Sequence, residues 1–221
     1  MPPRVLKADQ GESINEAARV IMAGGVVAVP TESFYGLAVN ALDERAIERL
    51  LAIKKRREDH PILILIHSAE VLGRYAAQIP PVALRLIDAF WPGGLTMVFE
   101  ATPELPRLLT GGRGKIGVRL SSHSIPTELA RVSGVAITGT SANFTGEPPC
   151  DKPEDVLKIL GSHVDIVLDG GKSAGGKGST VLDVTFAPPF ILREGMVSRK
   201  LLTPFFQSLP PTHSPQSARS D

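Results

Sequence analysis

Residues 24–37 read GGVVAVPTESFYGL, and this stretch decides the fold class. Residues 26–29 are apolar at every position, which predicts a short strand with both faces buried. Pro30 ends that strand, and Gly24 and Gly25 end the helix that the apolar spacing of residues 14–22 predicts before it. A strand with two buried faces needs a helical layer on each side, so the stretch indicates an α/β domain.

Outward from this stretch, helices and strands alternate along the chain. Ser13 and Glu16 form a capping box at the start of the first helix. The alternating residues 95–100 predict a half-buried strand, and the last two strands, joined by Ala-Pro-Pro, are expected to be antiparallel. Apolar periodicity predicts the remaining helices from residue 43 and at 69–77, 81–90, 126–132 and 151–160, and strands at 62–66, 116–120, 135–138, 164–168, 180–186 and 190–193.

These elements predict a three-layer α/β domain over residues 1–206. Its twisted sheet is mixed, parallel and antiparallel, and is flanked by helices on both sides. Residues 207–221 contain three prolines and four serines and only two apolar residues, so they are expected to form a disordered tail.

Composition excludes several classes of function. The 221 residues hold 24 Lys and Arg against 23 Asp and Glu, a net charge of +1, so any anion binding must be local. The single Cys150 excludes an internal disulfide and a multi-cysteine zinc site. No apolar run is long enough to span a bilayer, and the N-terminus is too polar for a signal peptide, so a cytoplasmic location is expected.

Polar or glycine-rich loops follow four predicted strands, where ligands of open α/β sheets bind. They are residues 31–33, 139–143, 169–179 and 193–195. Simple turns explain each loop equally well on its own. The cationic run at residues 54–57 is either a solvated helix end or a phosphate clamp, and four further cations could converge on the same pocket: Arg113, Lys115, Arg119 and Arg193.

Other chemistries fit poorly. Gly171, Gly176 and Lys177 match a P-loop in part, but Gly178 replaces its Ser or Thr and a strand, not a helix, follows. The five histidines lack metal-ligand spacing, so no metal site from protein side chains is predicted. No G-x-S-x-G elbow of a serine hydrolase is present.

Taken in order, the motifs resemble those of the YrdC/Sua5 family of threonylcarbamoyl-AMP synthases. The resemblance covers about residues 10–200, and the ordered set is far more specific than any one motif. The matching pieces are PTESFYGL at 30–37, KKR at 54–56, WPGGLT at 91–96, GVR at 117–119, TSAN at 140–143, STVLD at 179–183 and ILREG at 191–195.

The resemblance implies a YrdC-like fold and ATP-dependent synthesis of L-threonylcarbamoyl-adenylate from L-threonine and bicarbonate, with release of pyrophosphate. The enzyme would be a nucleotidyltransferase using Mg²⁺, and a separate transferase complex would place the product on tRNA adenosine beside the anticodon. By motif position, Lys54 and Arg56 are the catalytic, phosphate-binding residues. The resemblance assigns Ser141, Asn143 and Arg193 to ATP, and Thr31, Arg119 and Ser179 or Thr180 to threonine.

The chain departs from the family motifs at two places, and three alternative functions remain open. Arg57 and His60 replace the usual residues after K-x-R, and Leu65 stands where many members carry a histidine that His67 could replace. These changes affect substrate selectivity, including threonine against serine. The alternatives are a carbamoyl-adenylate-forming relative, a YciO-like relative with a different substrate, and a double-stranded RNA-binding module that uses a local basic patch.

Overall fold

The computed structural model describes residues 2–207, and strand β2 (Val27–Val29) confirms the predicted core strand because all three residues are buried. The α/β fold class is confirmed, but hydrogen bonding divides the strands into two mixed sheets rather than one. An isolated bridge between Asn40 and Ile137 links them. In order across the first sheet lie β1 (Arg4–Lys7), β9 (Ile166–Asp169), β2, β3 (Gly36–Ala38) and β8 (Thr140–Ser141).

The second sheet contains the longer strands, and its strand order shows how distant segments meet. The predicted antiparallel pairing of the last two strands is confirmed, and the rest of the sheet is again mixed. Across this sheet lie β11 (Phe190–Arg193), β10 (Thr180–Asp183), β5 (Leu95–Glu100), β6 (Lys115–Arg119), β4 (Ile64–Leu65) and β7 (Ile137–Thr138).

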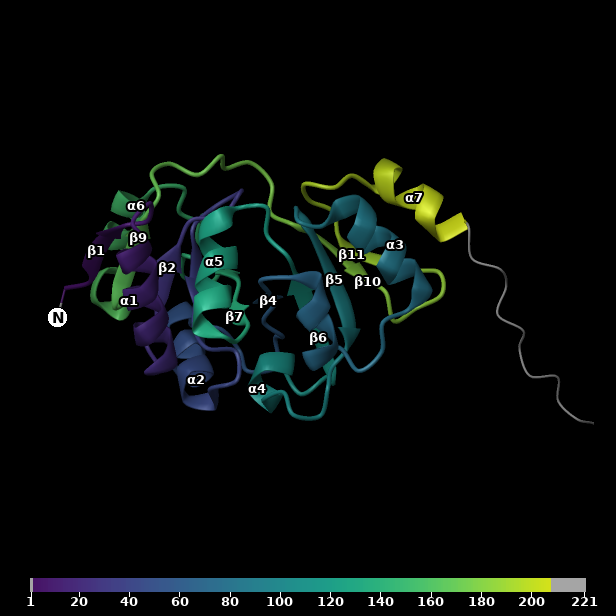
Figure 1. Cartoon of the computed structure of the whole chain (residues 1–221), viewed down its shortest axis with the longest axis horizontal. Helices are drawn as coiled ribbons and strands as arrows, with labels where there is room; N and C mark the ends of the chain where they lie inside the picture. Colours follow the sequence, from purple (N-terminus) through teal and green to yellow (C-terminus); the bar gives the residue numbers. More distant parts are fainter. Residues whose placement is uncertain (1, 208–221) are drawn as a thin grey trace, which may run out of the picture.

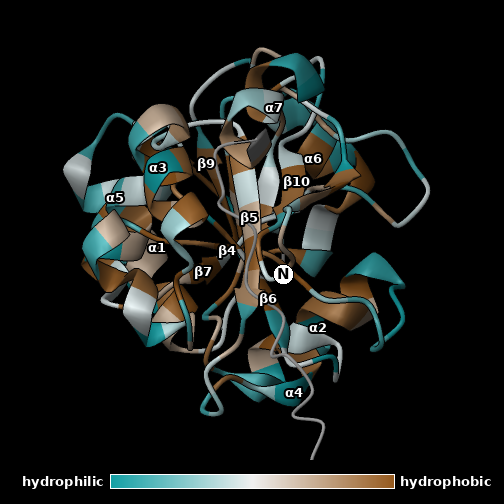
Figure 2. Ribbon diagram, turned by 90° about the vertical axis from the view of Figure 1, so that its right-hand side faces the viewer, coloured by the Kyte–Doolittle hydropathy of each residue, from teal (hydrophilic) through white to brown (hydrophobic). Residues whose placement is uncertain are grey.

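Helices cover both faces of the first sheet, as a buried strand requires (Figure 1). Val27 and Val29 pack in one apolar cluster with α1 (Gly11–Met22) and α5 (Ser124–Ser133). Ala28 packs on the opposite side with α2 (Glu44–Lys54) and α6 (Pro153–Ile159). Figure 2 shows the same layering, with brown strands inside and teal residues concentrated on the outer helices.

Successive side chains of β5 and β6 point alternately to the two faces of the second sheet. Leu95, Met97 and Phe99 are fully buried in the core, which confirms the predicted half-buried strand. The other face carries Thr96 and Val98, and it is the face that lines a cavity. The remaining helical segments are α3 (Pro81–Phe90), α4 (Arg107–Thr110), α7 (Arg199–Gln207) and the 3₁₀ turns η1 (Ala69–Arg74) and η2 (Gly161–His163).

Four local predictions are corrected. The capping box is wrong: α1 begins at Gly11 after Gln10, and Ser13 is buried inside the first turn, its N–H bonded to the Gln10 carbonyl at 3.0 Å. The segment expected to form a helix at 69–77 is the 3₁₀ turn η1. Strand β1 is not predicted by the sequence pattern. Helix α7 was also missed. It packs on α3 through the rings of Phe90 and Phe205, whose centroids lie 5.4 Å apart.

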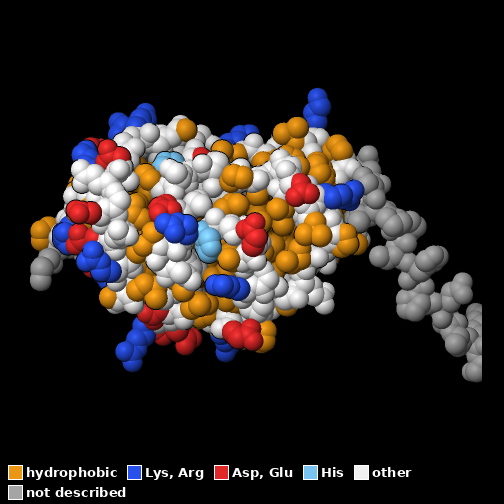
Figure 3. Space-filling view, viewed as in Figure 1, with side chains coloured by type: hydrophobic (Ala, Val, Ile, Leu, Met, Phe, Trp, Pro, Cys, Tyr) orange, Lys and Arg blue, Asp and Glu red, His pale blue; other side chains and the backbone are white. Residues whose placement is uncertain are grey.

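Surface charge is dispersed, in agreement with the net charge. Figure 3 shows cationic and acidic side chains interspersed with apolar ones on the face viewed. Helix α7 extends to Gln207, one residue beyond the predicted domain end, and the rest of the predicted tail lies outside the described residues. None of the helices within residues 2–207 has the length and apolarity needed to cross a bilayer.

Candidate active site

A cavity of about 770 Å³ lies between the two sheets and is lined by strands of both. Its volume is within the range of small-molecule sites. Cations dominate its charged lining: Arg56, Arg113, Lys115, Arg119 and Arg193 line it, against the single carboxylate of Asp183.

All four strand-end loops contribute to this one cavity. The chain therefore folds so that segments up to about 160 residues apart form one concave site, beyond what separate turns would require. The lining residues from these loops are Thr31, Ser33, Gly139, Thr140, Ser141, Gly178, Ser179 and Arg193.

Arg119, at the end of β6, lines the cavity. Its side chain is 5% exposed and its Nη1 donates to Glu32 Oε1 at 2.7 Å; Glu32 also accepts from the Ser121 hydroxyl. Burial lowers the pKa of Arg119, while the Glu32 carboxylate opposes that shift. Arg119 Nε is buried without a hydrogen-bond partner among the described residues.

Ser179 lies close to Arg119 in the sheet, since β5 joins their strands. Its Oγ accepts a hydrogen bond from Thr96 Oγ1 at 2.8 Å, and its carbonyl accepts one from Arg193 Nη2 at 2.9 Å. Of the two residues proposed to contact threonine here, Ser179 lines the cavity and Thr180 does not. Thr180 is fully buried, and its hydroxyl donates to the Val197 carbonyl at 2.6 Å.

Thr31, two residues after the end of β2, also lines the cavity. Its hydroxyl donates to the Phe34 carbonyl at 2.7 Å and lies 3.4 Å from Ser33 Oγ. The turn thereby holds two small hydroxyl groups at the cavity wall beside the Glu32–Arg119 pair. Hydroxyls next to a guanidinium suit an amino acid with a carboxylate and a polar side chain.

Lys54, the last residue of α2, is buried rather than solvated, so the alternative of a solvated helix end is wrong for it. Its Nζ donates to the Ser141 carbonyl and, at 2.6 Å, to Asn143 Oδ1. Burial, with a smaller contribution from the charge of Arg56, lowers the pKa of Lys54 to about 8. Only Ser141 of these three lines the cavity; Lys54 and Asn143 lie behind it and hold it in place.

Lys55 explains how the helix end presents Arg56. Lys55 adopts the left-handed conformation, with φ of 50°, and so turns the chain out of the helix. Arg56 then lines the cavity, and its Nη2 donates to the Pro61 carbonyl at 2.8 Å. Burial and, secondarily, the charge of Arg193 lower the pKa of Arg56, as expected for two guanidinium groups that share one cavity.

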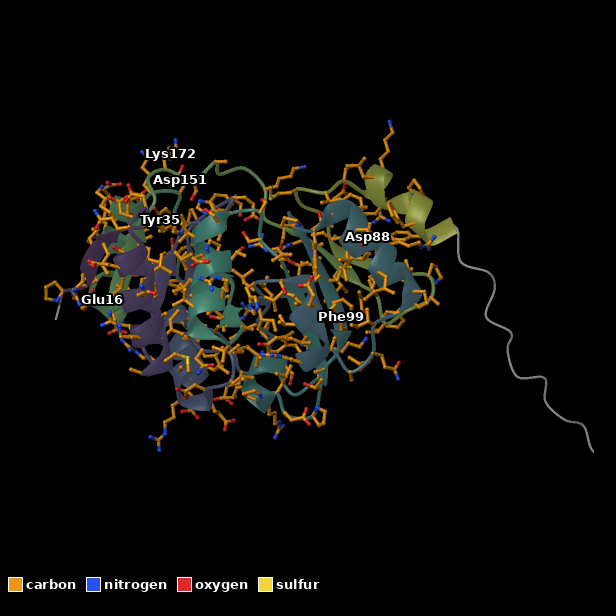
Figure 4. The ribbon with its side chains drawn as sticks, viewed as in Figure 1. Glu16, Tyr35, Asp88, Phe99, Asp151 and Lys172 are labelled. Atoms are coloured by element: carbon orange, nitrogen blue, oxygen red, sulfur yellow. The ribbon has the colours of Figure 1, made fainter. Side chains whose placement is uncertain are left out.

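The glycine-rich loop between β9 and β10 crosses from one sheet to the other (Figure 1). A strand follows it, which confirms the rejection of a P-loop. Tyr35, fully buried below the loop, donates its hydroxyl to the Gly171 carbonyl at 2.7 Å. Lys172 pairs with Asp151 at 3.6 Å, and Figure 4 shows both at the same end of the molecule as Tyr35.

Leu65 and His67 do not supply the imidazole of the family motif. Leu65 is buried in the apolar cluster of α1 and α5, and β4 ends there, before His67. Neither residue lines the cavity, whereas Leu63 does. Within the described residues, no group of three or more His, Cys, Asp or Glu could hold a metal ion.

Sequence reasoning gave no role to Glu32, Ser121 or Thr96, although all three contribute to the site. It did include Lys115 among the cations that could converge on one pocket, and Lys115 lines the cavity. The signal for Lys115 was available, because it lies two and four residues before Gly117 and Arg119 on one strand and so shares their face. Nothing in the sequence shows that Glu32 pairs with Arg119, 87 residues away.

Comparison with known proteins agrees with the motif resemblance. The family model of the Sua5, YciO and YrdC proteins, described as "Telomere recombination", matches residues 19–195. A threonylcarbamoyl-AMP synthase of Pyrococcus abyssi is 40% identical over 182 residues, which is 82% of this chain and 54% of that protein. The chain thus spans about half the length of that relative. A putative threonylcarbamoyl-AMP synthase of Mycobacterium tuberculosis is 36% identical over 86% of this chain and 87% of its own length.

Solved structures show the same fold. The crystal structure of P. abyssi Sua5 complexed with L-threonine superposes with a TM-score of 0.87 at 36% identity, covering 92% of this chain and 59% of that one. Escherichia coli YciO superposes with a TM-score of 0.80 at 30% identity, covering 90% of this chain and 97% of that one. On the extent of the family match and these identities, the chain belongs to the Sua5/YciO/YrdC family.

Proposed function

We propose that the chain is an ATP-dependent L-threonylcarbamoyl-adenylate synthase, a nucleotidyltransferase. The observation that carries this proposal is the meeting of cations and hydroxyl groups in one cavity. Arg56, Arg119 and Arg193 line it together with Thr31, Ser141 and Ser179. Relatives named threonylcarbamoyl-AMP synthase, one of them solved with L-threonine, support the same reading.

The threonine carboxylate binds Arg119, which lines the cavity. The hydroxyls of Thr31 and Ser179 bind the amino acid's polar groups. Bicarbonate and the threonine amine condense to an N-carboxylate with loss of water. Its oxygen then attacks the α-phosphorus of ATP, the bond to the bridging oxygen breaks, and pyrophosphate leaves with the electron pair.

The reaction needs the cations of this cavity because both reactants are anions. Arg56 and Arg193 compensate phosphate charge, and Ser141 forms a hydrogen bond with the nucleotide. Lys54 and Asn143 act from behind Ser141, and Lys54 adds a buried positive charge to that wall. Holding both anions in one cavity removes most of the entropic cost of their meeting.

Magnesium would enter with ATP. The described residues hold no cluster of carboxylates or imidazoles for a metal of their own, and the cavity's hydroxyls and cations suit a phosphate-bound ion. When bound, Mg²⁺ neutralises phosphate charge as a Lewis acid. A transferase complex and tRNA would use the product downstream.

The test is threonine-dependent and bicarbonate-dependent release of pyrophosphate from ATP, with the adenylate identified by mass. Omitting threonine, or replacing it with serine, measures selectivity. Turnover that ignores threonine would favour the YciO-like or carbamoyl-adenylate alternatives. RNA binding with a steep salt dependence and no turnover would favour the RNA-binding alternative.

A further inference from the structure

Arg113 lies in a glycine-rich loop between α4 and β6 and lines the cavity. Gly111 in this loop has φ of +60°, and a Cβ there would come within 2.8 Å of the Asp59 carbonyl oxygen, so the two backbones pack directly. The same segment carries Pro61, whose carbonyl binds Arg56. The close approach therefore holds the loop of Arg113 beside the segment that positions Arg56.

Among the cavity's cations, Arg113 differs in its lack of partners. Within residues 2–207 its side chain makes no hydrogen bond or ion pair. The other four are held by the protein: Arg56 by the Pro61 carbonyl, Lys115 by Asp183 and Thr185, Arg119 by Glu32, and Arg193 by Ser179. The charge of Arg113 is therefore available to an anionic ligand.

The position of Arg113 along β6 indicates which part of ATP it meets. Arg119 ends this strand and Lys115 begins it, so the two are about 13 Å apart along the strand. Arg113 lies before Lys115, at the end of the cavity remote from Arg119. In an in-line displacement the leaving group departs on the side opposite the attacking atom. With threonine at Arg119, pyrophosphate therefore leaves toward Arg113.

We propose that Arg113 binds the β- and γ-phosphates of ATP and the pyrophosphate that leaves. As the bond from the α-phosphorus to the bridging oxygen breaks, the electron pair passes to pyrophosphate, and the guanidinium compensates the added charge through two parallel hydrogen bonds. This inference rests on the proposed function for the identity of the reaction, but the phosphate contact itself can be measured without turnover.

The test is titration calorimetry of the full-length chain with Mg-ATP, pyrophosphate and AMP, for wild type, Arg113→Ala and Arg113→Lys. Arg131→Ala is the matched control, because Arg131 is an exposed arginine on α5, paired with Glu128 outside the cavity. For Arg113→Ala we expect about 10-fold to 100-fold weaker binding of ATP and pyrophosphate, the loss of a hydrogen bond to a charged group. AMP binding should stay within about twofold, since AMP lacks the two outer phosphates.

Partial retention by Arg113→Lys and no change in Arg131→Ala would support the assignment. Equal weakening of ATP and AMP would overturn it, as would unchanged ATP binding or a rise in the KM for threonine alone. Failure of the proposed function appears separately, as a wild type that binds ATP but does not release pyrophosphate in response to threonine.

Discussion

The ion pair between Glu32 and Arg119 offers the sharpest test of how this site is built. Its side chains are 11% and 5% exposed, so solvent screens the pair little. Removing the carboxylate in Glu32→Ala leaves a buried guanidinium without its counter-charge, which costs about 3–5 kcal/mol of folding free energy. In a chain of this length, about 2–4 °C of melting temperature is lost per kcal/mol, so we expect a fall of about 6–20 °C.

The Glu32→Gln variant tests the charge of the carboxylate separately from its size and shape. Glutamine keeps an oxygen that can accept from Arg119 Nη1 at the 2.7 Å position but lacks the charge, so a smaller loss of about 1–3 kcal/mol is expected. Because Glu32 orients Arg119, both variants should raise the KM for threonine more than they lower kcat. The glutamine variant should retain part of the threonine affinity that the alanine variant loses.

Urea unfolding and initial-rate kinetics measure these effects. Glu128→Ala is the control, because Glu128 pairs with Arg131 on the exposed surface of α5 and its loss should cost less than about 1 kcal/mol. In a double-mutant cycle, removing Arg119 as well should recover part of the stability lost in Glu32→Ala. The reasoning would be refuted by a Glu32→Ala variant no less stable than Glu128→Ala, or by an unchanged KM for threonine.

Two further predictions concern residues behind the cavity wall. Because burial lowers the pKa of Lys54 to about 8, the unfolded chain binds more protons than the folded one between about pH 8 and the ordinary lysine value of 10.5. The wild type should therefore gain stability relative to Lys54→Met as pH rises through this window. ATP affinity of the wild type should fall above pH 8. Parallel curves of unfolding free energy against pH for the two proteins would contradict this. Thr180→Val should lose about 1–3 kcal/mol, because the Gly195 and Val197 N–H groups lose the hydroxyl that accepts from them at 2.8 and 3.1 Å. Threonine KM should stay unchanged in Thr180→Val and rise in Ser179→Ala; the reverse would restore Thr180 as the contact.

Burial decides between the two interpretations of the cationic run at residues 54–57. A solvated helix end requires exposed lysines, yet Lys54 is 3% exposed and bonded to Ser141 and Asn143. Its loss is therefore expected to reduce stability as well as ATP use, unlike the loss of Arg56, whose one side-chain hydrogen bond within residues 2–207 is to the Pro61 carbonyl.

The sequence by itself determined the fold class and most of the elements. The spacing of apolar residues along a strand or helix shows which of its sides is buried. The apolar run of β2 and the alternation of β5 are such patterns, and both appear in the structure as predicted. The ordered motifs likewise identified the family. These signals come from neighbouring residues, whose side chains point in directions that backbone geometry alone dictates.

Only the tertiary structure decided the division into two sheets, the choice of Ser179 over Thr180 and the partners of each cation. Glu32 meets Arg119 across 87 residues, and Lys54 meets Asn143 across 89. Such contacts depend on how whole elements pack, which no local pattern records. Packing also decides which cation of the cavity has no partner among residues 2–207, and that is why Arg113 could be singled out only after the chain was folded.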